Sequence, residues 1–182
     1  MNIEIIACVS KNYGLGKDED LLFKIKDDLK WFKDRTKGQI CIYGSKTFES
    51  IMKMNGKPLP NRVNVVLTRS KDYKAPHGVF VFHSVEDIIK ASKTMGEKDK
   101  NIMICGGSKV YEEFLPYANT VYLTHVSKVV EDANVFYPIE AQEELGFRVV
   151  RKSHKHYDEK EDVYYRFVEY TNPLKMREGK LL

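Results

Sequence analysis

Short aliphatic runs alternate with segments of helical periodicity along most of this 182-residue chain. The runs have the length of buried strands and are too short to cross a bilayer. A strand, a helix and a following parallel strand form a unit that buries both faces of a sheet. The alternation therefore predicts an α/β fold: a three-layer sandwich with a central, mostly parallel sheet and helices on both faces.

The expected strands are residues 3–9, 39–43, 62–67, 79–82, 102–105 and 121–126. The expected helices are residues 25–35, residues 46–54, a helix that opens with the capping-box segment 84–87, and a helix that ends at Phe114. Residues 147–156 and 163–169 flank a charged turn, which predicts an antiparallel hairpin at the C-terminal edge of the sheet. We expect one domain over residues 1–170, followed by a loosely held polar tail, 171–182.

Composition narrows the class of protein. Hydrophobic residues make up 42% of the chain, as in folded globular domains. The N-terminus lacks the regions of a signal peptide, so we expect a cytoplasmic protein without a membrane partner. Cys8, Cys41 and Cys105 lie far apart, which favours buried free thiols over a zinc site. The dispersed net charge of +4 suits an anionic small molecule and gives little support to nucleic-acid binding.

Asp28 is the first candidate functional residue. In a helix over residues 25–35, Ile25, Leu29 and Phe32 form an apolar stripe that includes the position of Asp28. A carboxylate that faces a core without a partner is costly, so Asp28 requires matched hydrogen-bond donors, which a ligand can supply. The alternative is that Asp28 is an ordinary acid of the first helical turn.

Polar residues follow three of the expected strands at the point where each strand ends. Gly44-Ser45-Lys46-Thr47 and Gly106-Gly107-Ser108-Lys109 each combine glycine, hydroxyl and lysine at the start of a helix, and Thr68-Arg69-Ser70 follows another strand. Free N–H groups beside lysine can bind phosphate, and ligands of open α/β sheets gather at these carboxyl ends. Neither glycine junction is a Walker A loop or a G-x-G-x-x-G fingerprint, and simple glycine turns are the alternative.

Several segments, in the same order, resemble the dihydrofolate reductase family. Residues 27–32 resemble the helix that carries the family's active-site acid, and residues 13–16 the start of its mobile lid. Residues 44–51, 58–64 and 104–111 are similar to its first cofactor junction, its substrate-tail segment and its paired-glycine junction, and residues 122–125 and 132–138 continue the match. The resemblance implies a monomer that reduces 7,8-dihydrofolate to 5,6,7,8-tetrahydrofolate with NADPH, in support of one-carbon and thymidylate metabolism.

The resemblance also implies a role for each site residue. Asp28 would bind the pterin and promote protonation of N5 while C6 receives the hydride, Thr124 would hydrogen-bond the same carboxylate or the pterin edge, and Arg62 would pair with the glutamate tail. The apolar substrate pocket would contain Ile6, Cys8, Phe32, Ile51 and Leu59. NADPH would contact Ala7, Gly16, Leu21, Gly44, Ser45, Lys46, Thr47, Leu67, Thr68, Arg69, Cys105, Gly106, Gly107, Ser108, Lys109, Val110 and Tyr111, with Thr68 and Arg69 at its 2′-phosphate.

Two further expectations concern Asp28 and its surroundings. Burial beside Phe32 and Leu29 is expected to raise the pKa of its carboxyl group. Leu22 and Phe23 stand where family members usually have Pro-Trp, so an indole N–H near the acid is missing. No metal site is expected, because no third ligand accompanies the two histidines of segment 154–156.

Two other functions are compatible with the same fold. A pyrimidine reductase of the riboflavin pathway is one, but its substrate has no glutamate tail to pair with Arg62. A non-catalytic binding or structural protein is the other, and loss of Asp28 or of the paired glycines would be typical of it.

Overall fold

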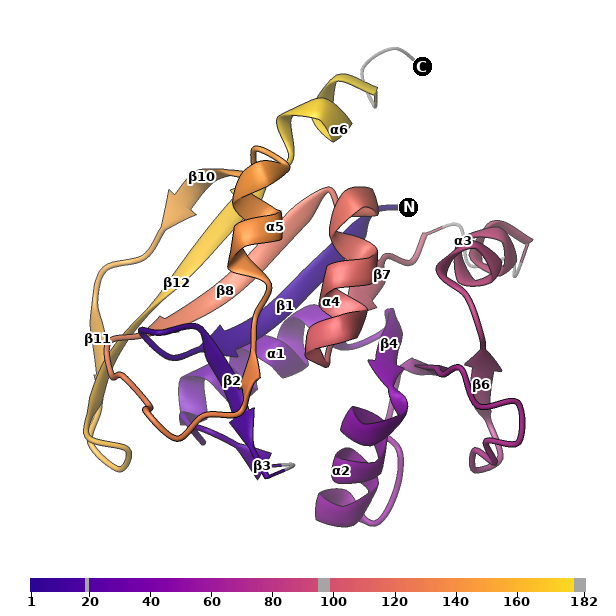
Figure 1. Cartoon of the computed structure of the whole chain (residues 1–182), viewed down its shortest axis with the longest axis horizontal. Helices are drawn as coiled ribbons and strands as arrows, with labels where there is room; N and C mark the ends of the chain where they lie inside the picture. The colour runs from indigo at the N-terminus through magenta and orange to yellow at the C-terminus, as the bar shows by residue number, and fades with distance from the viewer. Residues whose placement is uncertain (19, 95–98, 179–182) are drawn as a thin grey trace.

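The computed structural model describes residues 1–18, 20–94 and 99–178. A nine-stranded sheet has the order β10-β12-β8-β1-β7-β4-β5-β6, with β11 paired to β12 (Figure 1). Its strands are β1 (Ile3–Val9), β4 (Ile40–Gly44), β5 (Val63–Leu67), β6 (Val79–Phe82), β7 (Ile102–Ile104), β8 (Thr120–Val126), β10 (Arg148–Lys152), β11 (His156–Asp158) and β12 (Val163–Thr171). The helices are α1 (Lys26–Thr36), α2 (Ser45–Asn55), α3 (Val85–Thr94), α4 (Ser108–Phe114), α5 (Ile139–Glu144) and α6 (Pro173–Glu178), and a 3-10 turn covers Leu115–Tyr117.

Strand direction follows the alternation in the sequence. Every neighbouring pair from β8 to β6 is parallel, whereas β12 runs antiparallel to β8 and to both β10 and β11. Each expected strand from residue 3 to residue 126 is present within two residues of its predicted limits. The predicted α/β class, with its parallel centre and antiparallel C-terminal edge, is confirmed.

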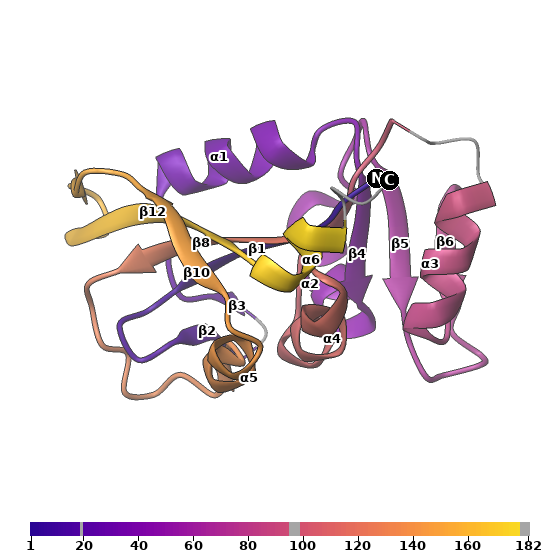
Figure 2. The same cartoon turned by 90° about the horizontal axis from the view of Figure 1, so that it is seen from above.

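Two apolar cores lie on opposite faces of the sheet, because successive side chains of a strand point to opposite faces. Ile5, Ala7 and Val9 of β1 belong to a core that includes residues of α3, α4 and α5. Ile6 faces the other core, to which α1 and α2 contribute. Figure 2 shows α1 on one side of the strands and α4 and α5 on the other, which gives the three layers.

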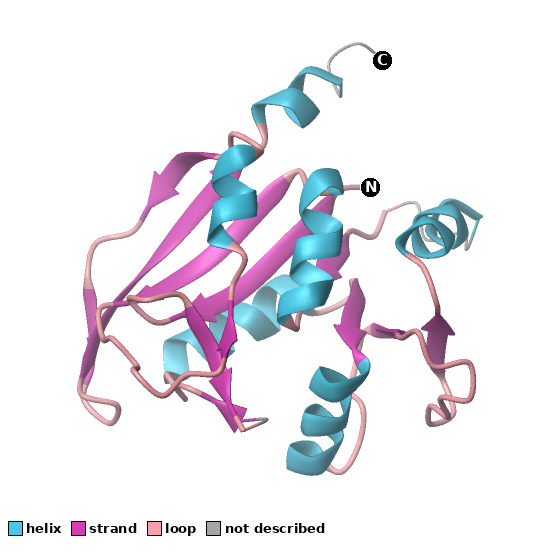
Figure 3. Cartoon of the chain, in the orientation of Figure 1, coloured by secondary structure: helices cyan, strands magenta, loops and turns pink. Residues whose placement is uncertain are grey.

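A second, three-stranded sheet was not expected. It has the order β3-β2-β9 and consists of β2 (Gly14–Lys17), β3 (Asp20–Leu21) and β9 (Val135–Phe136). Both pairings are antiparallel, and its short strands stand beside the main sheet in Figure 3. Two-residue strands beside glycines have no alternating apolar pattern, so sequence periodicity could not reveal them.

The C-terminal region corrects two predictions. Segment 147–156 is not one strand: its pairing shifts register between Val149 and Arg151, and the strand ends before Ser153. The Ser153 hydroxyl accepts from the Phe167 N–H at 3.0 Å, so a side chain replaces a backbone acceptor there. Segment 171–182 was expected to be a loosely held tail; Thr171 ends β12, residues 173–178 form α6, and residues 179–182 lie outside the described residues. The Asn172 side chain accepts the Leu174 N–H at 3.0 Å, which caps this helix.

The segment 84–87 forms the first half of the predicted capping box. The Ser84 hydroxyl accepts the Asp87 backbone N–H at 3.1 Å, and it donates to the Asp87 carboxylate at 2.7 Å. These two contacts cap the start of α3.

Candidate active site

Asp28 and Thr124 meet between α1 and β8. Asp28 lies in the first turn of α1, and the Thr124 hydroxyl donates a hydrogen bond to its Oδ1 at 2.5 Å. Thr124 is fully buried. Burial raises the pKa of the Asp28 carboxyl group, although hydrogen bonds from Thr124 and Cys8 act in the opposite direction. The site therefore holds a carboxyl group that retains its proton to higher pH than an ordinary aspartate does.

The apolar stripe assigned to this helix was wrong in part. Ile25 is the N-cap of α1: its backbone angles are extended, its carbonyl accepts the Leu29 N–H at 3.0 Å, and its side chain is fully buried. The Leu29 side chain is 45% exposed and cannot desolvate the acid. Phe32 does pack against the core beneath α1. Asp28 is thus both a first-turn acid and a partly buried carboxylate, and the two interpretations of its position are compatible.

The residues expected in the substrate pocket fall into two adjoining apolar clusters. Ile6, Phe32, Ile51 and Leu59 share one cluster between α1, α2 and the sheet. Cys8 packs in the other cluster, with Phe23, Ile25, Tyr165, Val126 and Val163. Phe23 is only 7% exposed, so it is a core residue and offers no polar group to Asp28.

Arg62 is fixed at the far end of α1. Its Nε donates to the Thr36 hydroxyl at 2.8 Å and its Nη1 to the Pro60 carbonyl at 2.6 Å. The Thr36 hydroxyl in turn donates to the Phe32 carbonyl at 2.6 Å, within the last turns of α1. These contacts hold the guanidinium in one orientation, which is the preorganisation needed for bidentate binding of a carboxylate.

The three polar junctions lie next to one another because β7, β4 and β5 are neighbours in the sheet. The Gly44 N–H donates to the Gly106 carbonyl at 2.7 Å, and Gly44 is the register partner of Leu67. One continuous edge therefore presents Gly44 to Thr47, Leu67 to Arg69, and Gly106 to Lys109. This arrangement is the one that a long ligand with several phosphates requires.

Glycine is needed at the paired junction for both space and backbone conformation. Gly106 has φ +123°, and an added Cβ would lie 3.3 Å from the Tyr111 hydroxyl. A Cβ on Gly107 would lie 3.1 Å from Thr47 Oγ1. The peptide bond between the two glycines is cis. At the neighbouring junction, the N-cap Gly44 gives the first turn of α2 no side-chain cap, and the N–H groups of such a turn can meet an anion.

The charged and hydroxyl side chains expected around the cofactor differ in exposure and in hydrogen bonding. Lys46, Lys109 and Arg69 are exposed, and Arg69 Nη2 lies 3.4 Å from the Glu113 carboxylate. The Ser108 hydroxyl donates to the Phe136 carbonyl at 2.5 Å.

The remaining expected cofactor residues are mainly parts of strands and cores. Val110 and Tyr111 pack in the core beneath α4, so only their backbone can face a ligand. Ala7, Leu67 and Thr68 are buried, Ser45 and Cys105 are partly buried, and Gly16 pairs with the exposed Leu21 in the small sheet.

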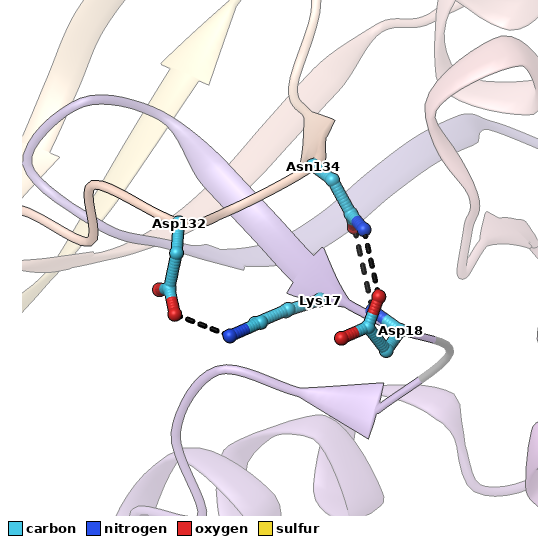
Figure 4. A network of polar contacts seen from close by, with 4 residues as sticks. All are labelled: Lys17, Asp18, Asp132 and Asn134. Carbon is cyan, nitrogen blue, oxygen red and sulfur yellow. Dashed lines mark hydrogen bonds and ion pairs between the residues drawn. The ribbon is translucent and has the colours of Figure 1, made fainter.

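The lid was expected to open with residues 13–16 and to continue over residues 17–22; β2 and β3 of the small sheet lie in this segment, of which Glu19 lies outside the described residues. Lys17 Nζ forms an ion pair with Asp132, and Asn134 Nδ2 donates to the Asp18 carboxylate at 3.0 Å (Figure 4). The Asp18 N–H also approaches Asn134 Oδ1 at 3.4 Å, and the Asn134 N–H donates to the Gly16 carbonyl at 3.2 Å. Segment 132–134 therefore holds the lid at its charged end.

Thr36, Asp132 and Asn134 are site residues that sequence reasoning missed. Each acts on a partner far away in the chain: Arg62 for Thr36, and the lid for the other two. No local pattern marks them, although Asp132 lies in one of the segments that carried the resemblance. A surface groove of about 530 Å³ beside the start of α1 is a separate feature, because the described residues that line it include none of the expected site residues.

Two structural findings apply to the described ranges only. In 1–18, 20–94 and 99–178, no helix is long and apolar enough to span a membrane. The same ranges contain no group of three or more His, Cys, Asp or Glu side chains placed to hold a metal ion.

Comparison with known proteins agrees with this geometry. The family model for dihydrofolate reductase matches residues 2–172. The chain is 40% identical over 130 residues to a dihydrofolate reductase from Buchnera aphidicola subsp. Baizongia pistaciae, covering 71% of this chain and 74% of that protein. It is 32% identical over 177 residues to the Bacillus subtilis enzyme, covering 97% and 98%.

A solved structure supports the same assignment. Dihydrofolate reductase from Enterococcus faecalis, complexed with NADP(H) and RAB-propyl, aligns with a TM-score of 0.81 at 30% identity, covering 94% of this chain and 96% of that one. The present chain belongs to the dihydrofolate reductase family.

Proposed function

We propose that this protein reduces 7,8-dihydrofolate to 5,6,7,8-tetrahydrofolate with NADPH, by hydride transfer to C6 and protonation of N5. The observation that carries the proposal is the pair formed by Asp28 and Thr124, a partly buried carboxyl group held at 2.5 Å by a hydroxyl donor. Such a group can hydrogen-bond the amino and ring N–H groups of a pterin and favour its protonated form. Hydride transfer itself needs positioning and exclusion of water rather than a nucleophile.

The residues at the carboxyl edge of β7, β4 and β5 fit NADPH. The uncapped first turn of α2 and the glycine pair, where a Cβ would be tightly placed, provide a close backbone approach for a diphosphate. Lys46, Lys109 and Thr47 would add charge and a hydroxyl, and Thr68 with Arg69 would hold the 2′-phosphate. When bound, NADPH supplies the hydride.

The substrate would lie between Asp28 and Arg62, at opposite ends of α1. The cluster that contains Ile6, Phe32, Ile51 and Leu59 would enclose the rings between them. Arg62, already oriented by Thr36 and Pro60, would take the α-carboxylate of the glutamate tail. Phe23 is part of a core and has no polar group to offer the acid, whereas the Thr124 hydroxyl donates a hydrogen bond to it.

We also propose that residues 1–170 act as one domain, and that the protein is a cytoplasmic monomer with a small-molecule substrate and no nucleic-acid partner. The dispersed charge argues against a nucleic-acid partner, and one central sheet with strands from Ile3 to Thr171 supports a single domain. Thr171 completes β12, and the segment that follows it would be an addition to that domain.

The test is oxidation of NADPH by the purified protein with dihydrofolate as acceptor. We expect one NADPH to be consumed for each tetrahydrofolate formed. A parallel reaction with a pyrimidine substrate of the riboflavin type should show no turnover. Folded protein that binds NADPH but does not reduce dihydrofolate would overturn the proposal.

A further inference from the structure

The first turn of α1 carries Asp28 but has no side-chain cap of its own. Ile25 is the N-cap residue, and its side chain makes no hydrogen bond to the N–H groups of the turn. A polar cap satisfies the first N–H groups of a helix and stabilises its start. The orientation of this turn, and with it the direction of the Asp28 carboxylate, therefore depends on contacts with other elements.

Two hydroxyl groups on adjacent strands contact this turn. The Tyr165 hydroxyl of β12 donates to Asp27 Oδ2 at 2.8 Å. The Thr124 hydroxyl of β8 donates to Asp28 Oδ1 at 2.5 Å. The register partner of Thr124 is Phe167, two residues from Tyr165, so the side chains of Thr124 and Tyr165 lie on the same face of the sheet. One face of the sheet thus presents two donors to two consecutive residues of α1.

Tyr165 is the fixed member of its pair with Asp27. Its side chain is buried in the cluster that also contains Ile25 and Val126. The His156 ring stacks against the Tyr165 ring, with 5.3 Å between the centroids and 19° between the planes. Asp27 is exposed, so the buried tyrosine determines where this carboxylate is held.

The rotation of the first turn about the helix axis decides where Asp28 points. Consecutive residues of an α-helix are about 100° apart around its axis, so a turn in which Asp27 meets β12 directs Asp28 toward β8. Ile25 anchors the turn in the core that it shares with Tyr165, but apolar burial is not directional. The hydrogen bond from Tyr165 is directional and can fix the rotation.

A surface groove lies between the start of α1 and the hairpin of β11 and β12. Asp27 and Tyr165 are among its lining residues. Charged side chains of both elements line it as well, namely Lys24, Lys26, Asp158, Glu159 and Lys160. The Lys24 N–H donates to Glu161 Oε1 at 3.2 Å, which is a second hydrogen bond from this end of α1 to the hairpin. Polar contacts across a groove therefore join the hairpin to the turn that carries Asp28.

We propose that Tyr165 is a positioning residue of the active site, and that its hydrogen bond to Asp27 fixes the rotation of the first turn of α1 so that Asp28 meets the Thr124 hydroxyl. The inference rests on the proposed role of Asp28 and extends it to the C-terminal hairpin. Tyr165 acts through Asp27 and the helix, and it needs no contact with substrate or cofactor.

The first test is the single-turnover rate of hydride transfer from NADPH to dihydrofolate at neutral pH. Tyr165→Phe and Asp27→Ala each remove the hydrogen bond and should slow this step by about 5–10-fold. Asp27→Asn removes the charge but keeps an acceptor, so it should recover most of the rate lost in Asp27→Ala. Tyr157→Phe is the matched control, because it removes a hydrogen bond of 2.6 Å to Asp162 within the same hairpin, and its rate should equal that of wild type.

The second test asks whether Tyr165 acts through Asp28. In an Asp28→Asn background, Tyr165→Phe should cause little further loss, within about 2-fold, because the group that it orients is already gone. A tyrosine that only stabilises the fold would slow both backgrounds equally or slow neither, and either result would overturn the proposal. Urea unfolding confirms that each variant is folded in the assay, and Asp27→Ala tests the same hydrogen bond at an exposed residue without altering the core.

The titration of Asp28 gives a readout that does not depend on turnover. Carbon NMR of its carboxyl group in ligand-free protein reports the titration midpoint. Burial is the main cause of the raised pKa of Asp28, and a turn released in Tyr165→Phe admits water to this carboxyl group. The midpoint should therefore fall toward that of an ordinary aspartate, whereas Tyr157→Phe should leave it in place. An unchanged midpoint in Tyr165→Phe would contradict the proposal, and turnover of wild-type protein with dihydrofolate tests the proposed function separately.

Discussion

Replacement of Arg62 by leucine should raise the KM for dihydrofolate about 100-fold and leave kcat within about 2-fold. Arg62 Nε and Nη1 are held by Thr36 and Pro60 at 2.8 and 2.6 Å, so the guanidinium is oriented before substrate arrives. Loss of a bidentate pair with a carboxylate costs roughly 2.7 kcal/mol, which corresponds to a factor of about 100. The effect falls on KM because the tail lies far from C6 and is bound equally in the ground and transition states.

The assay is steady-state NADPH oxidation with two substrates, dihydrofolate and a dihydropterin that lacks the glutamate tail. Arg62→Leu should lose efficiency only with dihydrofolate. Arg148→Leu is the matched control, because this exposed arginine of β10 carries the same charge away from the site. An unchanged KM for dihydrofolate, or an equal loss with the tail-less substrate, would refute the assigned role of Arg62.

Two further predictions concern the cofactor edge. Arg69→Ala should reduce the preference for NADPH over NADH by roughly 10-fold, because the exposed ion pair of Arg69 with Glu113 is weak and a 2′-phosphate can displace Glu113 from it. The ratio of kcat/KM for the two cofactors measures this preference. An unchanged ratio would mean that Arg69 does not bind the 2′-phosphate. Gly106→Ala should lower the free energy of unfolding by about 1–3 kcal/mol and weaken NADPH binding, because a φ of +123° is strained for alanine. Urea unfolding measures the first effect and NADPH titration the second. Wild-type values in both measurements would contradict the prediction.

Sequence patterns predicted the main sheet because its strands are continuous aliphatic runs. Ile40–Gly44 and Val63–Leu67 are buried on both faces. Such strands can be predicted from their own aliphatic residues, without knowing which strands they pair with. The small sheet was not predicted, because its strands β3 (Asp20–Leu21) and β9 (Val135–Phe136) are each two residues long and are defined only by their pairing with β2.

The candidate site was predicted unevenly for a related reason. Asp28 and Thr124 are 96 positions apart, and only the family resemblance linked them. The periodic interpretation of α1 failed at Leu29, which is 45% exposed although Ile25, four residues earlier, is fully buried. Thr36 and Asn134 act through tertiary hydrogen bonds that no local pattern specifies.

The pH dependence of the reaction follows from the state of Asp28. Burial raises the pKa of this carboxyl group, so it retains its proton to higher pH than an ordinary aspartate. The wild-type rate of hydride transfer should therefore fall as pH rises through that raised pKa. The substitution Asp28→Asn removes this titratable group. It should abolish the pH dependence caused by Asp28 and leave only the pH dependence caused by protonation of the substrate.

The most direct test of the account is the single-turnover rate of hydride transfer in Asp28→Asn and wild-type protein, measured from acid to neutral pH with NADPH and dihydrofolate. We predict that the variant is slower by at least about 100-fold at neutral pH. The difference should narrow at acid pH, where dihydrofolate arrives already protonated. A variant within a few-fold of wild type at neutral pH, or equally impaired at every pH, would contradict the role assigned to Asp28.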